Sequence, residues 1–178
     1  MESIPSQHKT IAKYIFQMIN SKTDSINSMQ HSPLIRQYSS NDYDSVLELI
    51  RLNTPTYFSR EEEKDLADYL KFKIQDYFVI DLNNQIVGSG GINYSDDKVK
   101  GIISWDMIDP KFQGKSLGKM LLEHRITILK YINSIEKIIV RTSQLTYPFY
   151  EKSGFEIIKI VKDYWAKGFD LEEVQLLK

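Results

Sequence analysis

The stretch that most constrains this chain runs from Asp106 to Lys119 and joins a strand pattern to the longest helix pattern in the sequence. Before it, Gly101–Trp105 is β-branched and aromatic, which is typical of a half-buried strand. Pro110 ends the strand because its nitrogen cannot donate to a sheet ladder. After it, apolar residues recur at the spacing of one helical stripe: Leu117, Leu121, Ile128 and Ile132. The sequence therefore predicts a strand, a tight turn and a long helix.

The turn before this helix has the composition of an anion site. A helix N-terminus presents unpaired backbone N–H groups and a partial positive charge, so small residues there allow an anion to reach the backbone. Gly118 should let the start of the helix lie close to its neighbours. Lys111, Lys115 and Lys119 add positive charge around the turn. We expect it to bind a phosphate group.

Two other interpretations of the turn stay open. Gly114-Lys115-Ser116 is similar to the end of a nucleotide-triphosphate loop, but the upstream glycine of such a loop is replaced by Asp109. The turn is also compatible with an ordinary strand-to-helix connection whose lysines are solvated.

Composition excludes several classes of protein. With 178 residues, 42% of them hydrophobic, the chain is long enough for one globular domain with a core. Its net charge of -1 argues against a general nucleic-acid binder. It has no apolar run of the roughly 20 residues that cross a bilayer, and its start does not resemble a signal peptide. The absence of cysteine excludes disulfides, thiolate metal sites and a cysteine nucleophile, and the three histidines are too scattered for a metal centre. We expect a cytoplasmic protein without a bound metal.

The first 33 residues are predicted to form an extension with a helix over about residues 8–20, followed by a Ser/Asn-rich linker. This helix is a candidate dimer contact or lid, or it packs on its own domain. The rest, residues 34–178, begins with a short strand at 34–38 and a helix that breaks near Asn53. A second helix is expected from Ser59, because Ser59 and Glu62 form a capping-box pattern.

The middle and end of the chain are predicted to be mainly strands. Residues 77–80 and 85–87 should form a hairpin, and a third strand should end at Ile108. After the long helix, residues 138–140 should pair parallel to that third strand, leaving a crevice where the sheet splays. A short helix over 145–153 and two closing strands, 155–161 and 170–177, complete the pattern around an intervening loop. This order indicates an α+β fold.

Two motifs resemble the GCN5-related N-acetyltransferase (GNAT) superfamily. Gln113, Ser116 and Gly118 fit its Gln/Arg-x-x-Gly-x-Gly/Ala acyl-CoA loop, with serine in place of the middle glycine. Pro148–Phe155 is similar to its Phe-Tyr-Glu-Lys-x-Gly-Phe segment. The likeness covers residues 34–178. It implies a mixed, mostly antiparallel sheet of about seven strands flanked by about four helices, with the N-terminal helix as an addition.

The resemblance also implies roles for individual residues. The backbone of Met107 and Ile108 should pair with the pantetheine arm of acetyl-CoA, and Ser143 lies near the position of a further pantetheine contact. Tyr150 matches the tyrosine that gives a proton to the CoA sulfur. The pyrophosphate would lie against the turn formed by Gln113, Gly114, Lys115, Ser116, Leu117, Gly118 and Lys119.

The general base and the acceptor are less well defined. Some members of the superfamily use a glutamate at positions that here are Ile102 and Ile139, which leaves Asp106 as the nearest ionisable candidate; it is equally compatible with an exposed strand-end carboxylate. Together with Asp163 and Asp170 it is a candidate for giving the acceptor pocket an acidic character suited to a cationic amine. The loop aromatics Tyr57 and Phe58 are further candidates for lining that pocket.

The leading hypothesis is an N-acetyltransferase that uses acetyl-CoA and acts on a primary amine, either of a small molecule or of an N-terminus or lysine. A non-catalytic acyl-CoA-binding regulatory module of the same fold is the alternative, and a nucleotide hydrolase is a third interpretation. A homodimer is compatible with the apolar N-terminal helix.

Overall fold

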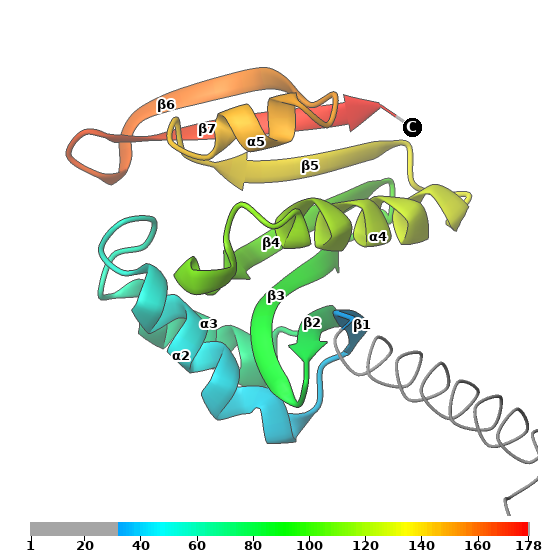
Figure 1. Cartoon of the computed structure of the whole chain (residues 1–178). Helices are drawn as coiled ribbons and strands as arrows, with labels where there is room; N and C mark the ends of the chain where they lie inside the picture. The colour runs from blue at the N-terminus through cyan, green and yellow to red at the C-terminus, as the bar shows by residue number, and fades with distance from the viewer. Residues whose placement is uncertain (1–31, 178) are drawn as a thin grey trace, which may run out of the picture. The chain divides into compact units, whose positions relative to one another are not determined.

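The computed structural model describes residues 32–177 (Figure 1). Seven strands form one sheet in the order β1-β2-β3-β4-β5-β7-β6, and β4 with β5 is the only parallel pair among them. The strands are β1 (Leu34–Gln37), β2 (Asp76–Leu82), β3 (Gln85–Tyr94), β4 (Lys100–Ile108), β5 (Lys137–Thr142), β6 (Glu156–Ala166) and β7 (Phe169–Leu177). The α-helices are α2 (Tyr43–Asn53), α3 (Glu62–Phe72), α4 (Leu117–Tyr131) and α5 (Tyr147–Glu151), with 3-10 turns at Ser40–Asp42 and Pro110–Phe112. The predicted α+β fold is confirmed.

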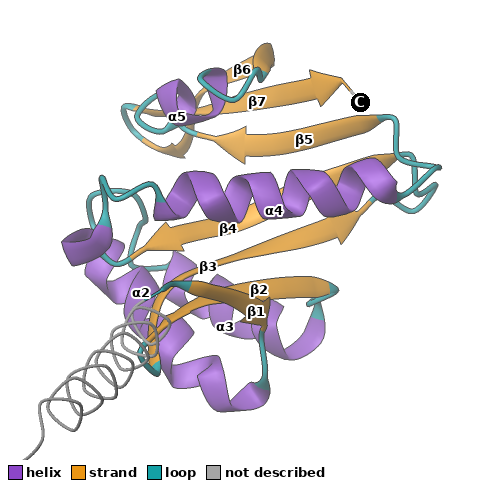
Figure 2. Ribbon diagram, turned by 45° about the vertical axis from the view of Figure 1, so that its right-hand side comes forward, coloured by secondary structure: helices purple, strands orange, loops and turns teal. Residues whose placement is uncertain are grey.

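Helices cover both faces of the sheet (Figure 2). On one face, α4 and α5 enclose a core cluster that includes Ile103, Leu121 and Phe155. On the other, α2 and α3 enclose a second cluster that includes Val46 and Met107. Helices therefore cover the middle of the sheet on both faces.

The strands β4 and β5 separate partway along their length. They pair from Lys100 to Ile103 and from Lys137 to Val140, and no pairing continues beyond that point. We call the unpaired region, Ser104–Ile108 of β4 and Arg141–Thr142 of β5, the fork. The crossover through α4 and the divergence of the two strands agree with the prediction.

A β-bulge in β4 lies at the start of the fork. Between the pairs Ser89↔Met107 and Gly91↔Ser104, β4 has one residue more than β3, and Trp105 there has a φ of 55°. Because side chains alternate along a strand, one extra residue moves all later side chains to the opposite face. Met107 accordingly packs in the α2/α3 cluster, while Ile108 packs against the α4 cluster.

Two element boundaries differ clearly from the sequence prediction. The helix α3 begins at Glu62 rather than Ser59, although the Ser59 N–H does donate to the Glu62 carboxylate at 2.7 Å. The strand β6 continues to Ala166, so that Asp163 and its aromatic neighbours are part of the strand and not of a loop. Strand character persists there because β6 resumes pairing with β7 at Ala166↔Phe169 after an irregularity in which Asp163 takes a φ of 51°.

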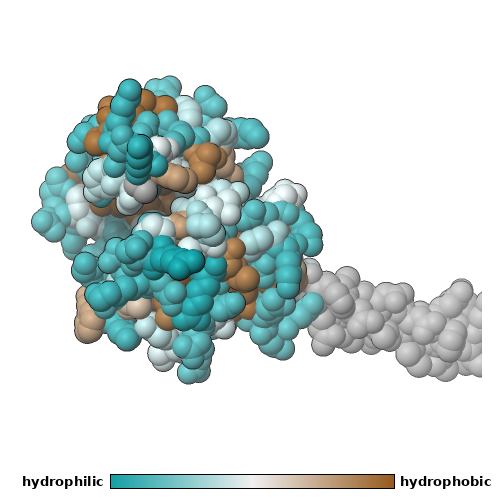
Figure 3. Space-filling model, turned by 90° about the vertical axis from the view of Figure 1, so that its left-hand side faces the viewer, coloured by the Kyte–Doolittle hydropathy of each residue, from teal (hydrophilic) through white to brown (hydrophobic). Residues whose placement is uncertain are grey.

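The predicted helix over about residues 8–20 and the linker after it lie outside the described residues, and the boundary at residue 33 stays a prediction. Within residues 32–177, no helix is both long and apolar enough to cross a membrane. The sheet edge formed by β6 carries exposed isoleucines, and apolar side chains gather at this end of the face shown in Figure 3.

Candidate active site

The turn between β4 and α4 leaves its backbone N–H groups unpaired. In the described structure, the amides of Gly114–Lys119 form no backbone hydrogen bond, and the Gln113 N–H makes only a long bond of 3.4 Å to the Pro110 carbonyl. The first intrahelical bond runs from Met120 to the Ser116 carbonyl at 3.0 Å. Six consecutive donors are therefore available to an anion at the N-terminus of a 15-residue helix.

Two residues with positive φ shape this turn. Gly114 has a φ of 73° and Ser116 a φ of 63°. A Cβ added at Gly114 would meet nothing within 4 Å, so the backbone here is open to a ligand. The left-handed angle explains why the family pattern has glycine at the position of Ser116, since glycine adopts such angles without steric cost. At Gly118, in contrast, a Cβ would reach Phe149 only at an ordinary 3.5 Å, so the close approach predicted for this glycine is wrong.

The side chain of Gln113 is used to fix the turn. Its amide nitrogen donates to the Ile108 carbonyl and to Asn53 Oδ1, both at 3.2 Å. The Asn53 amide nitrogen in turn donates to the Ile108 carbonyl at 3.1 Å. The end of β4, the turn and the end of α2 are thus held together.

A buried polar network lies beside the fork. The Tyr150 hydroxyl donates to Asp106 Oδ2 at 2.6 Å, and Asp106 Oδ1 forms an ion pair with Arg125 Nη2. Arg125, from the middle of α4, is fully buried. Its other nitrogens donate to backbone carbonyls, Nε to Leu121 at 3.1 Å and Nη1 to Gly91 at 3.2 Å. Three elements, β4, α4 and α5, therefore contribute one side chain each to this network.

The β4 bulge and Gly90 make the network possible. The register change at Trp105 places Asp106 on the α4 face of the sheet, where Tyr150 and Arg125 lie. A Cβ at Gly90 would come within 2.5 Å of Arg125 Nη1 and 2.6 Å of Asp106 Oδ1. Only glycine leaves room for the ion pair.

The environment of Tyr150 keeps its hydroxyl protonated. The ring is 5% exposed and packs edge-on against Phe149 and Phe155. Burial, and secondarily the adjacent negative charge of Asp106, raise the pKa of Tyr150 well above its usual value. The hydroxyl therefore carries its proton at neutral pH and can serve as a proton donor.

The remaining predicted cofactor residues lie around the same fork. Ser143 follows β5, and its hydroxyl is 3.3 Å from that of Thr146. Met107 and Leu117 are buried and their side chains belong to the two core clusters, so they could offer a ligand only backbone groups. Ile102 and Ile139, which the sequence analysis aligned with the glutamate positions of the family, are paired across β4 and β5 just before the fork.

Asp163 and Asp170, the residues expected to give the acceptor pocket an acidic character, hold the turn between β6 and β7. Asp170 accepts from the Asp163 N–H at 2.9 Å and Asp163 from the Gly168 N–H at 2.5 Å. Asp106 is paired with Arg125. The acidic character of the acceptor pocket stays a prediction.

Aromatic rings line the α2/α3 side of the fork. Phe58 stacks on Trp105 with ring centroids 6.3 Å apart, whereas Tyr57 is 40% exposed. On the β5 side, the Arg141 guanidinium lies 5.0 Å from the Tyr164 ring and 5.7 Å from the Trp165 ring. Within the described residues, Arg141 forms no ion pair with a carboxylate.

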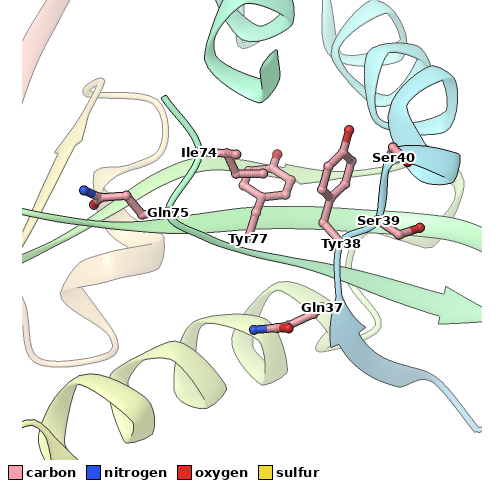
Figure 4. Close-up of a pocket in the computed structure, with 7 residues that line it drawn as sticks. All are labelled: Gln37, Tyr38, Ser39, Ser40, Ile74, Gln75 and Tyr77. Atoms are coloured by element: carbon pink, nitrogen blue, oxygen red, sulfur yellow. The ribbon is translucent and has the colours of Figure 1, made fainter. Parts of the chain in front are cut away.

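A surface pocket lies apart from this site, near the start of β2 (Figure 4). It contains no acid or base other than two tyrosines, and the Gln37 side chain points away from the two tyrosine rings. Its lining residues are Gln37, Tyr38, Ser39, Ser40, Ile74, Gln75 and Tyr77. No cluster of potential metal ligands occurs within residues 32–177.

Comparison with known proteins agrees with this geometry. Residues 73–157, which include the turn and the network, match the family described as "Acetyltransferase (GNAT) domain". The chain belongs to the GNAT superfamily. An amino-acid acetyltransferase of Pasteurella multocida is 31% identical to the GNAT chain over 134 residues, which are 75% of this chain but only 29% of that protein.

For two further proteins, the similarity to this chain extends over most of their own length. An N-alpha-acetyltransferase of Sulfolobus acidocaldarius is 25% identical over 154 residues, with 76% of this GNAT chain and 87% of the relative covered. A crystal structure of an aminoglycoside 6'-N-acetyltransferase complexed with coenzyme A has the same fold, with a TM-score of 0.66 at 13% identity, covering 81% of this chain and 96% of that one.

Sequence analysis assigned no role in the site to Arg125 or Asn53. Arg125 left a recognisable signal, because it lies four residues after Leu121 and four before Leu129 in the buried stripe of α4. A charged residue in such a stripe requires a buried partner of opposite charge.

Proposed function

We propose that this GNAT protein transfers the acetyl group of acetyl-CoA to a primary amine in the cytoplasm. The observation that carries the proposal is the row of unpaired amides at Gly114–Lys119, which lies next to the unpaired edge of β4 and opposite Tyr150. The pyrophosphate of coenzyme A could bind the amides while its extended pantetheine arm lies along the edge of β4.

The residues present fit acetyl-CoA as the acyl donor. The amides of residues 113–119 would bind the pyrophosphate, with Lys111, Lys115 and Lys119 adding charge, and all three lysines are exposed. The backbone of Met107 and Ile108 would pair with the pantetheine arm as an added strand, near Ser143. The thioester supplies the electrophilic carbonyl and a thiol leaving group, and most of the rate enhancement would come from positioning.

The acceptor would approach from the fork. The relatives named above act on amino acids or α-amines by their names, which supports an α-amine or a small primary amine as acceptor. Arg141 at the fork, with no carboxylate partner in the described structure, favours an amine that also carries a carboxylate over a polyamine.

A non-catalytic acyl-CoA-binding module is the second candidate, favoured by the apolar residues at both glutamate positions, Ile102 and Ile139. Measurements of acetyl-CoA binding and of turnover distinguish the enzyme from the non-catalytic module. Acetyl-CoA at 100 times its dissociation constant should stabilise the protein by about 2.7 kcal/mol in a thermal-shift measurement. ATP at the same concentration serves as the control. Stabilisation by ATP but not by acetyl-CoA would instead support a nucleotide site.

Turnover is measured as release of free CoA with a panel of amino acids, peptides and polyamines. We expect Tyr150→Phe to lower kcat by about 100-fold or more while acetyl-CoA binding is retained, because only the proton donor is lost. Binding of acetyl-CoA without CoA release from any amine would favour the non-catalytic module.

A further inference from the structure

Every nitrogen of the Arg125 side chain contacts a polar group, and these contacts fix its position. The guanidinium is fully buried between α4 and the sheet, and it donates to two backbone carbonyls, those of Leu121 and Gly91. Its remaining nitrogen faces Asp106 Oδ1, and neither of these two atoms has another polar partner in the described structure. The carboxylate is therefore held in one orientation by a charge that cannot move.

Asp106 is bonded on both oxygens but remains accessible. Oδ1 is paired with Arg125, and Oδ2 accepts the Tyr150 hydroxyl at 2.6 Å. About a fifth of the Asp106 side chain, 21%, is still exposed at the fork. The carboxylate can thus exchange a proton with Tyr150 on one side and with a group in the fork on the other.

We propose that Asp106 and Tyr150 act as one acid–base couple in acetyl transfer and that Arg125 is its positioning residue. This inference rests on the proposed function. The amine nitrogen, entering as the neutral amine, bonds to the thioester carbon, and the carbon–sulfur bond breaks. Asp106 takes the proton that the nitrogen loses, Tyr150 gives its hydroxyl proton to the sulfur, and Asp106 then returns its proton to the Tyr150 oxygen. The net change is one proton moved from nitrogen to sulfur, with both residues restored.

Charge explains why the two residues would act together. A phenolate on Tyr150 beside an ionised Asp106 would put two negative charges next to each other in a buried site. If Asp106 accepts the amine proton as Tyr150 releases its own, the couple carries a single negative charge throughout. Arg125 balances this charge.

The other titratable groups near the couple and Arg125 are Tyr69 from α3, Tyr77 from β2 and His124 from α4. Burial raises the pKa of both tyrosines, so they stay protonated. Burial, and secondarily the charge of Arg125, lower the pKa of His124.

The first test compares Asp106→Asn, Arg125→Met and the double variant with the wild type. Each single variant leaves one buried charge unpaired and should lose both stability and activity. The double variant removes both charges and should recover most of the thermal stability. Its kcat should nevertheless stay about 100-fold or more below the wild type, and the acidic limb of the kcat–pH profile should be absent.

A double variant that recovers turnover together with stability would show that the ion pair is only structural, and would overturn the inference while leaving the proposed function intact. The matched control is Arg36→Met with Asp42→Asn, which removes an ion pair of 2.8 Å between β1 and the turn before α2. This control should change stability without changing the pH profile.

A second test needs no acceptor. In protein labelled with 13C at the tyrosine Cζ, an NMR titration should show Tyr150 ionising at lower pH in Asp106→Asn than in the wild type, because the adjacent negative charge is gone. An unchanged titration would overturn the coupling. A wild-type protein that shows the coupling but releases no CoA with any amine would overturn the proposed function, and the catalytic step with it.

Discussion

At the scale of single residues, backbone angles restrict which residues fit the turn between β4 and α4 more than the space around it does. Ser116 has a φ of 63° and a ψ of 7°, a left-handed conformation that costs an L-residue roughly 1 kcal/mol. Gly114, two residues earlier, has a similar φ of 73° and open space around it. The two positions therefore form a matched pair for measuring the same backbone cost in opposite directions.

We expect Ser116→Gly to raise the free energy of unfolding by up to about 1 kcal/mol, because glycine removes the steric cost of the left-handed angle. Gly114→Ala should lower it by a similar amount, since nothing but the backbone angle opposes the new methyl group. Urea denaturation measures both. A destabilised Ser116→Gly would mean that the serine hydroxyl contributes more than its backbone angle costs.

Glu172 should make the free energy of unfolding depend on pH with the opposite sign to that of most carboxylates. It is 8% exposed, and its Oε2 has no hydrogen-bond partner in the described structure. Burial, with a smaller effect from Asp170, raises the pKa of Glu172. Because the folded-state pKa lies above that of the unfolded chain, the protonated form favours folding, and this contribution is lost as the pH rises through the folded-state pKa.

Glu172→Gln should therefore stabilise the protein by about 1 kcal/mol at pH 7 and have little effect below the pKa of an unfolded glutamate. Chemical denaturation at both pH values measures the difference. Glu173→Gln on the same strand is the control, and an equal effect of Glu172→Gln at both pH values would contradict the explanation.

At the scale of the elements, the periodic segments could be predicted from the sequence and the irregular ones could not. The helix α4 and the strands β2, β4 and β5 follow from apolar spacing. Asn83 and Asn84 in the β2–β3 turn take left-handed angles, which asparagine tolerates better than most residues. The bulge at Trp105 left no such signal, because a single extra residue depends on the pairing with β3. Sequence analysis therefore proposed Asp106 and Tyr150 separately and could not show that they touch.

The Gly90 position tests how tightly β3, β4 and α4 are fitted around the ion pair. Gly90→Ala should lower the free energy of unfolding by about 1–3 kcal/mol, because the methyl group would displace Arg125 and Asp106 from a buried contact. Gly118→Ala, where the nearest atom is at 3.5 Å, is the control and should cost much less. Equal stabilities of the two variants would show that the ion pair relaxes easily.

At the scale of the whole molecule, the sheet ends in an apolar edge. The edge strand β6 exposes Ile157, Ile158 and Ile160 at 37%, 48% and 54%. Exposed edge strands with such side chains tend to pair with other chains. A dimer through this edge would use a different surface from the N-terminal helix, which the sequence analysis named as a candidate dimer contact.

If β6 pairs with a second copy, Ile158→Lys together with Ile160→Lys should convert a dimer to a monomer with its unfolding free energy little changed. Light scattering after size-exclusion chromatography measures the mass. A Leu34→Lys variant, which adds charge at the opposite edge of the sheet, is the control. A wild-type protein that is monomeric at high concentration would contradict the prediction.

The burial of the Arg125–Asp106 pair has a consequence for how the protein responds to ionic strength. Lys111, Lys115 and Lys119 are exposed, so added salt screens their attraction for a diphosphate, with a screening length of about 8 Å at physiological concentration. Counter-ions do not reach the enclosed guanidinium. Raising the salt concentration should therefore weaken the capture of the acyl donor and leave the rate from the saturated complex nearly constant.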